Sequence, residues 1–83
     1  PNPFNPSTTI KFALPEPGMT RVAIFNVAGH HVKTLIDEDL PAQAHQVVWS
    51  GDDDSGRSVA AGVYFYMVSS GSNRSVGRMA LVK

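Results

Sequence analysis

The feature that most constrains the fold of this chain is the stretch of residues 59–70. It reads VAAGVYFYMVSS and has no polar face. Val, Tyr and Phe side chains favour extended backbone. An extended segment that is apolar on both sides needs cover on both faces or a central place in its sheet. The stretch is therefore predicted to form the central strand of a two-layer β domain.

Other segments have the alternation of half-buried strands, as in residues 7–14, where Ile10, Phe12 and Leu14 share one face. The remaining predicted strands span residues 19–27, 30–36, 43–49 and 74–82. A spacing of three between Val32 and Leu35 predicts a β-bulge or a twist at the strand end. The acidic stretch 37–39 is expected to be a loop.

No window of the sequence has the spacing of an amphipathic helix, so the domain is predicted to be all-β. Short strands about ten residues apart are typical of an immunoglobulin-like antiparallel β-sandwich of about seven strands, and an open barrel is the alternative. Residues 1–83 are too few for two cores and are predicted to form one domain. Trp49, Tyr64 and Ile24 are expected to be buried between the two sheets.

Composition excludes several function classes. The net charge is zero and the seven Lys and Arg residues are scattered, which disfavours nucleic acid as a partner. There is no Cys for a thiol nucleophile or a zinc-thiolate site, and no apolar run long enough for a membrane span. Neither a nucleophile motif nor a pair of carboxylates across a cleft is visible, so no enzymatic activity and no cofactor are expected.

Two groups of residues invite a metal-site hypothesis. The acidic loop Asp52 to Gly56 is rich in oxygen ligands, but Gly51 stands where a calcium loop has its first carboxylate. A turn in which Asp side chains accept backbone N–H groups is the preferred interpretation. His30 and His31 are adjacent and would point to opposite faces of a strand, which argues against a shared metal ion.

Four motifs together give a family resemblance: PNPFNPSTTIKFALP at the start, VAIFNVAGHHVKTL, HQVVWSGDDDSGRSVAAGVYFY, and MALVK at the end. The chain resembles the FlgD-like family of Ig-like C-terminal domains, related to the flagellar hook-capping protein and to type IX secretion sorting domains. The structural signature residues are Phe4, Trp49, Gly51, Asp53, Gly56, Gly62, Tyr64 and Tyr66.

The resemblance implies a non-catalytic C-terminal module of a secreted or surface bacterial protein, extracellular or at the cell surface, that serves as a sorting signal or surface anchor. The implied partners are secretion or outer-membrane machinery, or neighbouring copies or domains of the parent protein. A self-assembling subunit of an extracellular polymer and a carbohydrate-binding module are the alternatives. The predicted interaction surface comprises Phe4, Val63, Phe65, Met67, Arg78 and Lys83, with Phe4 expected to plug one end of the core or a pocket on a neighbour.

Overall fold

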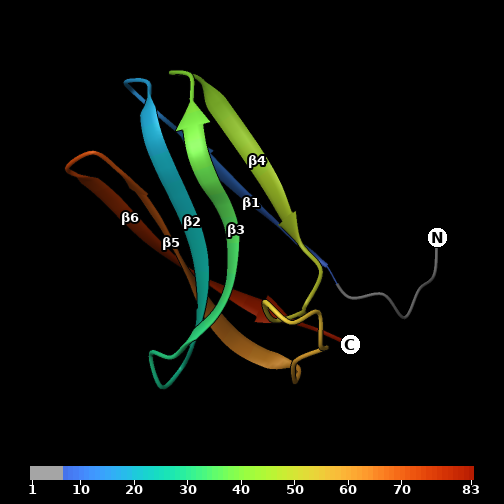
Figure 1. Cartoon of the computed structure of the whole chain (residues 1–83). Helices are drawn as coiled ribbons and strands as arrows, with labels where there is room; N and C mark the ends of the chain where they lie inside the picture. The colour runs from blue at the N-terminus through green and yellow to red at the C-terminus, as the bar shows by residue number, and fades with distance from the viewer. Residues whose placement is uncertain (1–6) are drawn as a thin grey trace.

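The structure is a computed structural model that describes residues 7–83, so Phe4 lies outside the described residues. Its strands are β1 (Thr8–Ala13), β2 (Gly18–Asn26), β3 (His31–Leu40), β4 (Ala44–Trp49), β5 (Gly62–Ser70) and β6 (Asn73–Leu81). They form two antiparallel sheets, β1-β4 and β3-β2-β5-β6 (Figure 1). The predicted all-β sandwich is confirmed, with six strands in residues 7–83 where about seven were expected. That part of the chain contains no helix capable of crossing a membrane.

Strand β5 takes up most of the apolar stretch identified in the sequence, and it lies inside the larger sheet, between β2 and β6. Its inward face includes Tyr64 and Val68, which are buried. Its outward face carries Val63, Phe65 and Met67, which are only partly buried. The central position is therefore confirmed, but no second layer of described residues covers the outward face.

The core lies between the two sheets. Ile10 and Trp49 from the smaller sheet meet Val22, Ile24 and Tyr64 from the larger sheet. Trp49 and Ile24 have no exposed surface, as the sequence predicted. Because cores are closely packed, these contacts hold the two sheets face to face.

The β2–β3 hairpin contains two irregularities. The pairing register shifts between Val22 and Ala23 and again between Ile24 and Phe25, which leaves Leu35 and Val32 of β3 without direct partners. These are the two residues whose spacing predicted a bulge, and extra residues of this kind bend and twist a strand.

The expectation of a loop at residues 37–39 is wrong, because all three residues belong to β3. Asp39 pairs with Met19, Glu38 with Thr20 and Asp37 with Arg21. The three carboxylates are exposed on an edge strand, where charge is tolerated and discourages pairing with other chains. Backbone pairing to β2 therefore overrides the low strand propensity of acidic residues.

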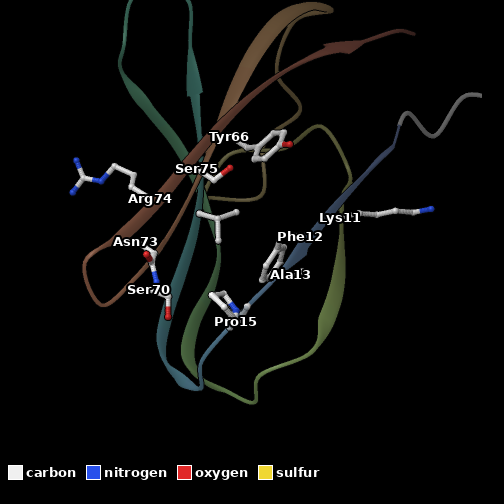
Figure 2. Close-up of a pocket in the computed structure, with 11 residues that line it drawn as sticks. Lys11, Phe12, Ala13, Pro15, Tyr66, Ser70, Asn73, Arg74 and Ser75 are labelled. Atoms are coloured by element: carbon white, nitrogen blue, oxygen red, sulfur yellow. The ribbon is translucent and has the colours of Figure 1, made fainter.

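The smaller sheet covers only part of the larger one. A pocket of about 180 Å³ remains between β1 and the β5–β6 hairpin (Figure 2). Its walls include Phe12 and Leu14 on one side and Tyr66 and Val68 on the other. The interior of the sandwich is thus accessible along one side.

Candidate functional site

Trp49 anchors the loop that joins β4 to β5. Its indole Nε1 donates a hydrogen bond to the Asp52 carbonyl at 2.8 Å, and its ring meets that of Tyr64 edge-on with centroids 4.9 Å apart. The Tyr64 hydroxyl in turn donates to the Ala60 carbonyl at 2.6 Å. Both buried aromatic side chains therefore satisfy their polar atoms on the loop backbone and hold its two ends.

Asp53 organises the tip of this loop. Its Oδ1 accepts hydrogen bonds from the Ser55 hydroxyl at 2.7 Å and from the backbone N–H groups of Ser55 and Arg57, each at 2.9 Å. The hydrogen bond from the Ser55 hydroxyl, followed by the one from the Arg57 backbone, holds the pKa of Asp53 below its ordinary value. Gly56 has φ 85°, a conformation that favours glycine. Asp53 is thus a turn cap, as the sequence predicted.

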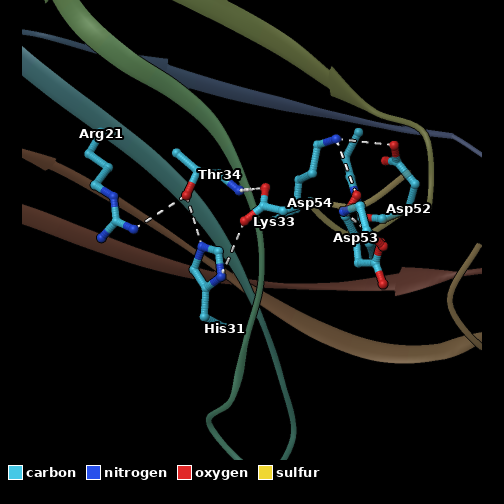
Figure 3. Close-up of polar contacts among 9 residues, drawn as sticks. Arg21, His31, Lys33, Thr34, Asp52, Asp53 and Asp54 are labelled. Carbon is cyan, nitrogen blue, oxygen red and sulfur yellow. Dashed lines mark hydrogen bonds and ion pairs between the residues drawn. The ribbon is translucent and has the colours of Figure 1, made fainter. Parts of the chain in front are cut away.

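The two neighbouring acids attach the loop to the edge strand β3 (Figure 3). Asp52 pairs with Lys33 at 3.1 Å, and both side chains are about a quarter exposed. Asp54 Oδ1 accepts the Thr34 backbone N–H at 3.0 Å, and the Asp54 N–H donates to the Val32 carbonyl at 3.1 Å. The loop therefore occupies backbone groups of β3 that would otherwise be open to another strand.

His31 lies on β3 and His45 on β4, in different sheets. His31 contacts Asp54 at 3.6 Å and Thr34 at 2.8 Å. His45 stacks on Phe12 with ring centroids 5.3 Å apart. Across residues 7–83, no three His, Cys, Asp or Glu side chains are grouped so that they could hold a metal ion.

The outward face of the larger sheet carries an apolar surface, here called the outer patch, formed by Phe25, Val27, Phe65, Met67 and Val76. These residues line a hollow of about 300 Å³. Val27 is 73% exposed and Val76 is 63% exposed. Large apolar side chains that gather in this way on a sheet face are typical of contact surfaces.

The structure brings together four of the six residues predicted to form an interaction surface. Val63, Phe65 and Met67 lie on the outward face of β5, and Arg78 is directly opposite Phe65, so its side chain is on the same face. Lys83 lies elsewhere, because its Nζ contacts the Ser58 hydroxyl and the Val59 carbonyl. Whether these residues bind a partner stays a prediction.

Sequence reasoning missed three members of the outer patch: Phe25 and Val76 on neighbouring strands, and Val27 just beyond the end of β2. Phe25 is opposite Phe65 across the β2–β5 ladder, and Val76 is opposite Met67 across the β5–β6 ladder. Side chains of directly paired residues lie on one face. Only the pairing register could have identified Phe25 and Val76, since neither strand shows by itself which neighbour it meets.

Comparisons with known proteins agree with this architecture. The model of the FlgD Ig-like domain family matches residues 4–74. FlgD from P. aeruginosa has a TM-score of 0.73 and 17% identity, with 90% of this chain and 58% of that chain covered. FlgD from Xanthomonas campestris has a TM-score of 0.71 and 23% identity, with 93% and 56% covered. No curated protein matches the sequence.

At these identities the solved structures show the fold alone, and this chain spans little more than half the length of either FlgD chain. The family match nevertheless corrects the function expected from the sequence. A sorting signal or surface anchor is wrong, because the matching family and the solved structures are those of FlgD, which in Xanthomonas campestris is linked to hook capping. The polymer-subunit and carbohydrate-binding alternatives are likewise not what the comparisons found. Because the family model covers most of its length, this chain belongs to the FlgD Ig-like domain family.

Proposed function

We propose that this chain is a non-catalytic Ig-like module of a longer extracellular protein, and that its outer patch packs against a neighbouring domain or subunit. The family and the hook capping described for FlgD of Xanthomonas campestris support a structural role in an assembly outside the cell. The observation that carries the proposal is the outer patch itself.

The outer patch has the composition and placement of an interface centre. Phe25, Phe65 and Met67 stand on β2 and β5, the two inner strands of the larger sheet, and are held in place by ladders on both sides. Arg78 lies beside Phe65 on β6. Aromatic residues, Met and Arg are enriched at the centres of protein interfaces, where rigid anchors are covered by a partner.

The polar side chains of the β4–β5 loop support a role without catalysis. Asp53 caps backbone N–H groups, Asp52 pairs with Lys33, and Asp54 accepts the Thr34 N–H. A general base or a nucleophile needs a partner group positioned for proton transfer to a substrate. These carboxylates are instead engaged in holding the loop on the sheet.

The proposal is tested by comparing the isolated chain with the longer protein that contains it. Backbone amide resonances of residues 63–67 and 76–78 should shift in the longer protein or its assembly, whereas those of β4, in the other sheet, should not. Met67→Glu should return the shifted resonances to their positions in the isolated chain, because burying an unpaired carboxylate against an apolar partner is unfavourable.

Val48→Glu is the matched control. Val48 is 51% exposed on β4, in the other sheet, so the same charge is added away from the outer patch. This variant should leave the shifted resonances in place. The proposal is wrong if the outer-patch resonances are the same in both proteins, or if Val48→Glu and Met67→Glu act alike.

A further inference from the structure

We propose that the open edge of β1 accepts an extended strand from a protein other than this chain, which adds to the smaller sheet and places an apolar side chain in the pocket beside it. This inference concerns the side of the sandwich between β1 and β6, and it does not rest on the proposed role of the outer patch.

The hydrogen-bond pattern shows which backbone groups of β1 face its partner β4. Just beyond the end of β1, the Leu14 N–H donates to the Gln43 carbonyl of the segment leading into β4, at 3.0 Å. In an antiparallel pair, the N–H and C=O groups of one residue point to the same neighbour, and those of the next residue point away. Phe12, opposite His45, and Ile10, opposite Val47, therefore also face β4.

The alternate residues Thr9, Lys11 and Ala13 consequently direct their N–H and C=O groups away from β4. Within residues 7–83, β1 pairs with no other strand. Three residues in extended conformation thus present a regular row of donors and acceptors. Only another extended backbone repeats donors and acceptors at the same spacing, which defines the chemistry of the occupant.

The pocket lies directly against this edge. Lys11 and Ala13 border it, although in Figure 2 the Lys11 side chain points away from it while Phe12 is directed toward it. Lys11 therefore borders the pocket with its backbone. Opposite, Tyr66 and Val68 of β5 supply an apolar wall. An added strand would have its inward side chains over this wall, and about 180 Å³ suits one or two side chains of Val or Leu size.

The smaller sheet has a physical reason to accept a third strand. A two-stranded ribbon is only marginally stable, and a sheet of three strands with an apolar face is more stable. The outward face of β1 also favours a negatively charged residue on the added strand, because Lys11 is the one charged residue of β1 and is exposed. The occupant is therefore an extended segment with alternating apolar residues inward and a carboxylate outward, beside Lys11.

The first measurement is amide hydrogen exchange in the unliganded chain. The amides of Ile10, Phe12 and Leu14 should exchange slowly, and those of Thr9, Lys11 and Ala13 should exchange rapidly. Slow exchange at all six positions would mean that the edge is already paired and would overturn the proposal.

The second measurement uses a synthetic peptide of about seven residues, long enough to span the edge, with Val at inward positions and Thr flanking a central Glu at outward positions. Binding should slow exchange at Thr9, Lys11 and Ala13 by about tenfold or more. The same peptide with N-methyl groups on its bonding amides should bind about tenfold more weakly or worse, because each methyl removes a ladder donor.

Ala13→Pro removes one outward N–H and should weaken binding of the unmethylated peptide by a similar factor. Ala44→Pro is the matched control: Ala44 is opposite Ala13 on β4, and its N–H points away from β1. This variant should bind as the original chain does. The methylated peptide, tested on the unmutated chain, does not depend on either variant folding.

Three results would overturn the inference. One is the absence of peptide binding at millimolar concentration, and another is equal binding of the methylated and unmethylated peptides. The third is a dimer in sedimentation that disappears with Ala13→Pro, which would identify a second copy of this chain as the occupant.

Discussion

Tyr66 of β5 lies directly opposite Gly77 of β6, and its ring covers the space that a Cβ atom on Gly77 would occupy. A Cβ built there would overlap the Cζ, Cε2 and hydroxyl atoms of Tyr66. The backbone conformation at residue 77 does not require glycine, because its φ is not positive. The glycine instead allows an aromatic ring to pack flat on an edge strand, which also shapes one wall of the pocket beside β1.

Gly77→Ala should therefore destabilise the domain by about 1–3 kcal/mol, because the added methyl group must displace the Tyr66 ring. The same substitution made in a Tyr66→Ala background should cost much less, since the overlapping atoms are gone. Urea unfolding of the two single variants and the double variant measures this coupling. Additive effects would show that the ring and the glycine do not interact.

Trp49→Ala should destabilise the domain by about 3–5 kcal/mol, because it leaves a cavity between the sheets and removes the indole donor to Asp52. Val48→Ala, one residue away but half exposed, should stay within about 0.5 kcal/mol of the original chain. Thermal unfolding of both variants decides the matter. A Trp49→Ala variant that melts together with Val48→Ala would contradict the packing described for the core.

The lowered pKa of Asp53 predicts a pH dependence of stability. The folded chain holds this carboxylate ionised at lower pH than the unfolded chain, whose Asp pKa is about 3.9. The contribution is therefore fully present above the unfolded pKa and is lost as the pH falls through the lowered folded pKa. Asp53→Asn should flatten the acid limb of a plot of Tm against pH. An acid limb as steep in Asp53→Asn as in the original chain would contradict this contribution.

Calcium should leave the stability of the domain unchanged. The carboxylates of Asp53 and Asp54 already accept backbone N–H groups, so a cation would have to compete with these bonds. Tm measured in EDTA and in millimolar Ca²⁺ should agree within about 5 °C, a difference that for this length corresponds to about 1 kcal/mol. A larger rise would identify a calcium site in the Asp52 to Gly56 loop.

Much of the fold could be predicted from local patterns in the sequence. The apolar stretch now seen as β5 indicated a central strand, and the alternation at Ile10, Phe12 and Leu14 indicated an inward face. Asp53 and Gly56 indicated a capped turn. These features depend on residues close together in the chain, where side-chain branching, alternation and turn chemistry act directly on the backbone.

The pairing of strands was decided only by the tertiary structure. The sequence did not show that the acidic residues 37–39 would extend β3, because this depends on the length of β2 opposite them. Nor did it place Phe25 and Val76 beside Phe65 and Met67, or Tyr66 over Gly77. Each of these juxtapositions depends on register between strands, and a shift of one residue would send every side chain to the opposite face. The outer patch and the open edge of β1 are therefore properties of the assembled sheets. The patch is built from several strands, and the edge is open because β1 pairs only with β4 among the described residues.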